Sequence, residues 1–122
     1  MATVLIVDDS PNARWVLGDL IAHESHEVIE AADGREALEL YRARRPDLVL
    51  IDLFMPRHDG FEAIRTLRTE FPDSRIIAVS ADWTVGNTSS LHVARELGAD
   101  VTIRKPFNIS VMRAAVTELL VA

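Results

Sequence analysis

The sequence predicts an α/β fold in which five parallel strands alternate with five helices that cover both faces of one doubly wound sheet. Short apolar runs alternate with segments of helical periodicity, which is typical of a parallel sheet wrapped by helices. The first run, from Val4 to Val7, is uninterrupted, as a strand buried on both faces should be. A closed barrel of the same units would need about twice the 122 residues present. Right-handed crossovers therefore favour an open three-layer (βα)5 sandwich.

The first two strand and helix units precede Pro46. Thr3 to Val7 is the first strand, and Ser10-Pro11 supplies a helix N-cap and a favoured first helical residue. Val28 to Ile29 is a short second strand, and Asp33-Gly34 opens the second helix. Apolar residues recur at helical spacing in both helices: Ala13, Val16, Leu17, Leu20 and Ile21 in the first, and Ala37, Leu38 and Tyr41 in the second.

Three further units follow Pro46. Their strands are predicted at Leu48 to Ile51, Ile76 to Val79 and Val101 to Ile103. A turn over Pro56 to Gly60 precedes the third helix, Gly98 is placed to stop the fourth, and Asn108 is placed to cap the fifth. The inward-facing residues of these helices are Phe61, Ile64, Leu67 and Phe71, then Leu91, Ala94 and Leu97, then Ile109, Met112, Val116 and Leu119.

Composition places the chain among ordinary globular domains and argues against several functions. A content of 48% hydrophobic and 26% charged residues fits one domain, residues 1–122, with a single core. A formal net charge of −6 argues against direct binding of nucleic acid, which needs a basic surface. The absence of cysteine excludes disulfides and thiolate nucleophiles. No apolar stretch approaches the ~20 residues of a membrane span, and no signal peptide is evident. We therefore expect a cytoplasmic protein without membrane insertion.

Polar side chains close four of the predicted strands. Asp8-Asp9 follows the first strand, Asp52 the third, Ser80 the fourth and Lys105 the fifth. Because open α/β sheets bind ligands at the carboxyl ends of their parallel strands, these side chains should lie together at one functional edge. Three carboxylates form a hard oxygen site suited to Mg²⁺. With a hydroxyl and an ammonium beside them, they predict a magnesium and phosphoryl site.

These groups have complementary roles in phosphoryl transfer. A carboxylate such as Asp52 can act as the nucleophile and form an aspartyl-phosphate. A metal ion and the compact ammonium of Lys105 would neutralise charge on the transferring group. The hydroxyl of Ser80 would hydrogen-bond a phosphoryl oxygen. Pro106 favours a cis peptide bond after Lys105, in a tight turn that would aim the lysine at the site.

Four motifs, in this order and each at a strand end, together form a specific signature. They are Asp8-Asp9, Asp52-Leu53-Phe54-Met55-Pro56 with Gly60, Ser80-Ala81, and Lys105-Pro106-Phe107. With these motifs the chain resembles the receiver domain of two-component response regulators, the CheY-like family, from about Thr3 to the last helix. The resemblance covers essentially the whole chain.

This resemblance implies a flavodoxin-like fold with strand order 2-1-3-4-5. It implies that Asp52 accepts a phosphoryl group from a histidine kinase or phosphotransfer protein, and that the chain catalyses only its own phosphorylation and dephosphorylation. The phosphorylated form would then change the face made by the fourth helix, fifth strand and fifth helix. The implied site residues are Asp9, Asp52 and the backbone carbonyl of Phe54 for Mg²⁺, with Asp8 assisting through water, and Lys105 and Ser80 for the phosphoryl group.

Three positions depart from the family pattern. Receivers usually carry an aromatic switch residue three positions before the lysine, where this chain has Thr102, so the usual aromatic relay is absent or replaced. The stretch from Asp82 to Ser90 is longer than the family norm by roughly three residues, which loops tolerate well and which suggests a shortened or displaced fourth helix. Phe54 and Asp82 would flank the phosphoryl group, where one would exclude water and the other would orient it.

Two surface features keep alternative interpretations open. Trp15 lies off the apolar stripe of the first helix, about 100° from Val16. It is either partly buried against a neighbouring loop or an exposed anchor for a docking kinase, since interface hot spots favour Trp. His23 and His26 have ligand-like spacing, but no further cluster supports a transition-metal site.

Three other functions compete with a stand-alone phosphoacceptor switch. A receiver-like scaffold that signals without phosphorylation would accommodate Thr102 and the long loop. An aspartate-nucleophile phosphatase of the haloacid-dehalogenase type needs a second acid two residues after the nucleophile, where this chain has Phe54. An FMN binder would need hydroxyls and amides after the first strand to hold phosphate, and Asp8-Asp9 would repel that group.

Overall fold

The computed structural model describes residues 1–55, 59–81 and 83–121. Its main sheet is parallel and has the strand order β2-β1-β3-β4-β7. The strands are β1 (Thr3–Val7), β2 (Glu27–Ala31), β3 (Leu48–Asp52), β4 (Ile76–Ser80) and β7 (Val101–Arg104). Since β7 is the fifth strand of this sheet along the chain, the predicted order 2-1-3-4-5 is confirmed.

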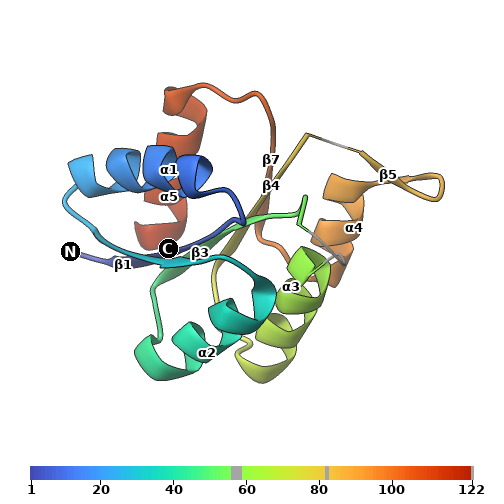
Figure 1. The fold of residues 1–122 in the computed structure, drawn as a ribbon, viewed down its shortest axis with the longest axis horizontal. Helices are drawn as coiled ribbons and strands as arrows, with labels where there is room; N and C mark the ends of the chain where they lie inside the picture. The colour runs from blue at the N-terminus through green and yellow to red at the C-terminus, as the bar shows by residue number, and fades with distance from the viewer. Residues whose placement is uncertain (56–58, 82, 122) are drawn as a thin grey trace.

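Helices cover both faces of the sheet (Figure 1). They are α1 (Pro11–His23), α2 (Gly34–Arg44), α3 (Asp59–Glu70), α4 (Ser90–Leu97) and α5 (Ile109–Val121). Helices α1 and α5 lie on one face, and α2, α3 and α4 lie on the other (Figure 1). Each face has its own apolar core, one containing Leu17, Ile21 and Met112 and the other containing Ala37, Ile64 and Ala94. The described helices include none with the length and apolar composition that a membrane span requires.

Local capping signals explain where the helices begin and end. The backbone N–H of Ala13 donates to the Ser10 hydroxyl at 3.2 Å, and Asp33 caps α2 in the same way at 2.8 Å. The side chain of Asn108 accepts a hydrogen bond from the N–H of Val111 at 2.8 Å. Gly98 ends α4 with a φ of 122°, a conformation that favours glycine. The predicted caps and the predicted stop are all present.

Two parts of the chain differ from the sequence prediction. The long segment after β4 contains a small antiparallel hairpin, β5 (Thr84–Val85) and β6 (Thr88–Ser89), which was not predicted. The predicted turn over Pro56 to Gly60 is wrong at its end, because Gly60 lies in the first turn of α3. Residues 56–58 of that turn lie outside the described residues. Helix α4, which the long segment precedes, is the shortest of the five, with 8 residues.

Candidate functional site

Strand register brings the predicted site residues to one edge of the sheet. Val7 of β1 is paired with Ile51 of β3, so the next residues along, Asp8 and Asp52, lie side by side at the carboxyl ends of their strands. Ser80 of β4 is paired with Arg104 of β7, and the backbone N–H of Lys105 donates to the Ser80 carbonyl at 2.8 Å. The ends of four parallel strands thus place two carboxylates, a hydroxyl and an ammonium at the same edge of the sheet.

The carboxylate of Asp52 is held from two sides. Asp52 is 8% exposed. Its Oδ2 lies 3.1 Å from the Nζ of Lys105, and its Oδ1 accepts a hydrogen bond from the backbone N–H of Phe54 at 2.9 Å. The peptide bond between Lys105 and Pro106 is cis, as its sequence predicts. The carboxylate therefore has a fixed orientation and a neighbouring cation before any substrate arrives.

Asp8 is the more deeply buried carboxylate, at 2% exposed. Its Oδ1 accepts a hydrogen bond from the N–H of Ser10 at 2.9 Å. Its Oδ2 is buried and has no hydrogen-bond partner among the described residues. Burial, followed by the nearby charge of Asp52, raises the pKa of Asp8 to about 6, although the Ser10 hydrogen bond and Lys105 oppose the rise. A buried carboxylate oxygen without a donor, beside a second carboxylate, is the environment that a divalent cation would stabilise.

The third predicted carboxylate, unlike the other two, is exposed. Asp9 is exposed at the rim of the edge. Within residues 1–55, 59–81 and 83–121, no three His, Cys, Asp or Glu side chains come close enough together to hold a metal ion. Asp8 and Asp52 are the two carboxylates that interact here, and the predicted ligand roles of Asp9 and of the carbonyl of Phe54 stay predictions. Oxygen donors with room for water are typical of magnesium sites.

The hydroxyl of Ser80 is engaged with a residue outside the predicted site. Ser80 is fully buried, and its Oγ lies 2.9 Å from the Oγ of Ser90, the first residue of α4. Thr102, at the position where an aromatic switch is usual, accepts a hydrogen bond from the Nη2 of Arg95 at 2.9 Å. Both contacts reach α4, which makes this helix a direct neighbour of the site.

Aromatic side chains border the phosphoryl side of the edge. Phe54 is 71% exposed, and its ring meets the ring of Trp83 edge-on, with centroids 6.3 Å apart. The ring of Trp83 also packs against Phe61 of α3, at 5.6 Å. Asp82, predicted to orient water, lies outside the described residues. What the structure describes of this border is therefore apolar.

Gly60 allows α3 to approach the backbone of the site. A Cβ atom at this position would lie 3.0 Å from the carbonyl oxygen of Asp52 and 3.1 Å from the Cα of Leu53. Both are backbone atoms, which cannot turn aside as a flexible side chain would. The glycine in the predicted motif is thus explained by close packing of a helix against the strand end that carries Asp52.

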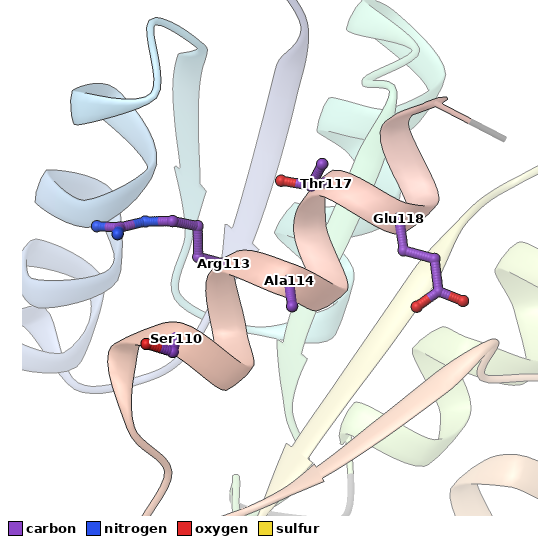
Figure 2. A pocket seen from close by; sticks show the side chains of 5 residues that line it. All are labelled: Ser110, Arg113, Ala114, Thr117 and Glu118. Atoms are coloured by element: carbon purple, nitrogen blue, oxygen red, sulfur yellow. The ribbon is translucent and has the colours of Figure 1, made fainter.

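The surface around α1 offers an exposed aromatic residue and a groove. Trp15 is 70% exposed, so the interpretation that it is partly buried is wrong. Trp15 lines a depression together with Arg14, Gly18, Asp19, Ala22, Val28 and Glu30. A separate groove includes the site lysine; its lining residues are Asn12, Ala13, Val16, Leu17, Lys105 and Phe107. A different depression runs along α5, lined by Ser110, Arg113, Ala114, Thr117 and Glu118 (Figure 2). None of the predicted site residues lines the α5 depression, so it is not a candidate for the phosphoryl site.

The sequence motifs did not point to two residues that contact the site. Ser90 carries no local signal, because its contact with Ser80 depends on how the hairpin folds. Arg14 donates from Nη1 to the carbonyl oxygen of Asp8 at 2.6 Å and pairs with Glu30 at 3.0 Å. Arg14 is the fourth residue after the Ser10 cap, and no sequence motif distinguishes it from an ordinary surface arginine.

The family model of the response regulator receiver domain matches residues 4–117 of this chain. The chain belongs to this family. Receiver domains act in two-component signal transduction, so the function predicted from the four motifs is confirmed at the level of the family. The phosphatase and the flavin-binding alternatives are thereby set aside.

Two relatives match this receiver along most of their length. Sporulation initiation phosphotransferase F of Bacillus subtilis is 34% identical over 117 residues, which cover 96% of this chain and 92% of that protein. Chemotaxis protein CheY of Thermotoga maritima is 40% identical over 108 residues, 88% of each chain. A longer relative, probable transcriptional regulator ycf27 of Cyanophora paradoxa, is 36% identical, and the chain spans 47% of its length.

Solved structures share the receiver fold. Response regulator TrrA of Thermotoga maritima, determined in complex with Mg²⁺-BeF, superposes with a TM-score of 0.85 at 32% identity and covers 98% of this chain and 100% of that one. Chemotaxis protein CheY4 of Vibrio cholerae gives a TM-score of 0.86 at 30% identity, with 98% and 99% covered. The flavodoxin-like fold is confirmed by these neighbours.

Proposed function

We propose that this receiver is a phosphoacceptor switch in which Asp52 takes a phosphoryl group in a magnesium-dependent reaction. The observation that carries the proposal is the buried Asp52 carboxylate, oriented by the N–H of Phe54, neighboured by Asp8 and 3.1 Å from the ammonium of Lys105. The donor would be a histidine kinase or a phosphotransfer protein, and a small acyl phosphate would serve in its place. The receiver would act in the cytoplasm, as its sequence suggests.

The chemistry requires one bond to form and one to break. An oxygen of Asp52 attacks phosphorus, and the bond from phosphorus to the donor's leaving atom breaks. The ammonium of Lys105 already contacts the Asp52 carboxylate. It would stabilise the negative charge of the phosphoryl oxygens during the transfer. The hydroxyl of Ser80 would donate to another of those oxygens.

Mg²⁺ would be held by Asp9, Asp52 and the backbone carbonyl of Phe54, with Asp8 assisting through water. When bound, it would supply positive charge that offsets repulsion between the carboxylates and the incoming phosphoryl group. The Oδ2 atom of Asp8, buried and without a partner among the described residues, supports this assignment. Catalysis is confined to the receiver's own phosphorylation and to hydrolysis of its own aspartyl-phosphate.

The decisive experiment is incubation with Mg²⁺ and acetyl phosphate, followed by intact mass. We expect a phosphoryl adduct in the wild-type protein, none in Asp52→Asn, and none when EDTA removes the metal. The matched control is Asp73→Asn, an exposed aspartate outside the site that should leave the adduct unchanged. Equal labelling of wild type and Asp52→Asn would refute the assignment of the nucleophile. A stable partner complex that is indifferent to Asp52→Asn would favour the scaffold that signals without phosphorylation.

The face of α1 is the proposed docking surface for the phosphoryl donor. Trp15 is exposed on α1, and a separate groove on the same helix is lined by Val16 and includes Lys105. Tryptophan is among the residues whose truncation most often weakens binding at a protein interface. Trp15→Ala should therefore slow phosphotransfer from a cognate kinase roughly tenfold or more while leaving labelling by acetyl phosphate unchanged. If both rates stay at the wild-type value, Trp15 is not an anchor.

A further inference from the structure

Two buried serine hydroxyls join the end of β4 to the start of α4. Ser80 and Ser90 are both fully buried, and their Oγ atoms are 2.9 Å apart. Either serine can be the donor, because a hydroxyl carries one proton and two lone pairs. The hydrogen bond between the two serines can therefore run in either direction.

The main chain holds Ser90 in this position. Its backbone N–H donates to the carbonyl oxygen of Trp83 at 2.7 Å, which closes the segment that contains β5 and β6. Ser90 is also the first residue of α4. A change at the Ser90 hydroxyl is thus a change at the start of this helix.

The side chain at position 102 cannot provide an aromatic connection. Thr102 has no ring, and its hydroxyl accepts a hydrogen bond from Arg95 in the last turn of α4. Helix α4 is therefore bonded to β7 near its end and to Ser80 at its beginning. The Ser80–Ser90 contact is a hydrogen bond that links a predicted phosphoryl-binding side chain to α4.

We propose that Ser90 is a positioning residue for the phosphoryl group and the link through which the site reaches α4. This inference rests on the proposed phosphorylation of Asp52. When Ser80 donates its single proton to a phosphoryl oxygen, it can no longer donate to Ser90, so Ser90 donates to Ser80. Phosphorylation then selects one of the two directions, and the two consecutive hydrogen bonds polarise each other. Ser90 aligns the Ser80 proton with the phosphoryl group and senses its presence.

The first test is the affinity for beryllium fluoride in the presence of Mg²⁺, the pair bound in the related TrrA structure, measured by calorimetry. Ser90→Ala should weaken binding roughly 3- to 10-fold, the effect of one hydrogen bond. Ser90→Thr, which keeps a hydroxyl, should restore most of the affinity. The control is Ser74→Ala, which removes a buried hydroxyl near the opposite end of β4 that has no partner among the described residues. It should bind like the wild type.

Two further measurements separate a positioning role from a structural one. In a Ser80→Ala background, Ser90→Ala should cause no further loss of affinity, because it acts through Ser80. Hydrogen exchange over residues 90–97 should change when beryllium fluoride binds the wild type, and this change should be much smaller in Ser90→Ala. An equal loss of affinity in both backgrounds, or an undiminished response of α4, would overturn the proposal.

Failure of this inference can be told apart from failure of the proposed function. A wild-type protein that neither takes a phosphoryl group from acetyl phosphate nor binds beryllium fluoride overturns both. A wild type that does both, while Ser90→Ala matches it in affinity and in α4 exchange, overturns the role of Ser90 alone. Thermal unfolding is recorded for each variant. If Ser90→Ala does not fold, Ser90→Cys replaces it, because a thiol is a weaker donor than a hydroxyl, and the same loss of affinity and of α4 response is expected.

Discussion

At the scale of single residues, one lysine balances two buried carboxylates. Lys105 contacts Asp52 directly, while Asp8 has the more unfavourable environment, with one oxygen bonded to Ser10 and the other buried without a partner among the described residues. The raised pKa of Asp8 measures how poorly its charged form is stabilised without a metal ion. The site therefore carries an energetic penalty that a divalent cation would relieve.

Asp8→Asn should stabilise the metal-free protein at neutral pH. A pKa raised from 3.8 to about 6 means that the folded state binds a proton that the unfolded state has already lost, so the stability supplied by protonated Asp8 disappears as the pH rises through 6. Above that pH the charged group costs the folded state about 3 kcal/mol. Because asparagine keeps an oxygen for Ser10 and carries no charge, urea unfolding at pH 7.5 with EDTA should show a gain of that order.

The pH dependence and a control make this prediction specific. The gain of Asp8→Asn over wild type should shrink toward zero as the pH falls to 4, where Asp8 is protonated, and should also narrow when Mg²⁺ is added. Asp73→Asn, at an exposed position, should change stability by less than about 0.5 kcal/mol. A gain that is constant from pH 7.5 to pH 4 would show that charge is not its cause.

At the scale of elements, the packing of α3 against the end of β3 sets the geometry of Asp52. Gly60→Ala would press a methyl group onto the backbone of Asp52 and Leu53, at 3.0 and 3.1 Å. Forced overpacking of this kind typically costs about 1–3 kcal/mol. We expect lower stability in urea unfolding and slower labelling by acetyl phosphate, since the displaced backbone carries the nucleophile.

Gly18→Ala is the matched control within α1. There the new Cβ would meet only side chains, Val28 at 3.6 Å and Ile6 at 3.9 Å, which are ordinary contacts. Alanine in a helix interior is favoured over glycine by about 0.5–1 kcal/mol, so this variant should be slightly more stable and be labelled at the wild-type rate. Equal behaviour of the two variants would mean that the close approach at Gly60 does not matter.

The comparison of elements also shows which signals in the sequence were sufficient. The strands of the main sheet and the caps at Ser10 and Asn108 are local patterns, and they were predicted. The hairpin was missed although Gly86-Asn87 between Thr84-Val85 and Thr88-Ser89 is a two-residue turn signal, and Gly86 has the positive φ that such turns need. The extra length of the segment favours an insertion in a loop, and this interpretation does not predict a hairpin.

The partner of Ser80 could not have been predicted in the same way. The hydrogen bond between Ser80 and Ser90 spans ten residues and exists because the hairpin returns the chain to the end of β4. The difference in burial between Asp8 and Asp9 is likewise invisible in the sequence, where the two are equivalent neighbours. Contacts that depend on the path of a loop or on the direction of a side chain carry no periodic signature.

At the scale of the whole molecule, the candidate site belongs to the central sheet that both cores enclose. Its residues follow β1, β3, β4 and β7, which are successive neighbours in the sheet and are covered by α1 and α5 on one face and by α2, α3 and α4 on the other (Figure 1). Unfolding of any of these four strands would remove a residue from the site. Occupation of the site is therefore coupled to the stability of the entire domain.

Mg²⁺ together with beryllium fluoride should raise the unfolding temperature of the domain. A ligand that binds only the folded state stabilises it by about 2.7 kcal/mol at a concentration one hundred times its dissociation constant. For a domain of this size that corresponds to an increase in Tm of roughly 10 °C, measured by differential scanning calorimetry. Neither Mg²⁺ nor beryllium fluoride alone should reach this value, since each leaves part of the charge at the site uncompensated. Asp52→Asn should lose the combined effect, because it removes the carboxylate that binds both. An equal increase in that variant would place the binding elsewhere on the molecule and would break the proposed coupling between the site and the fold.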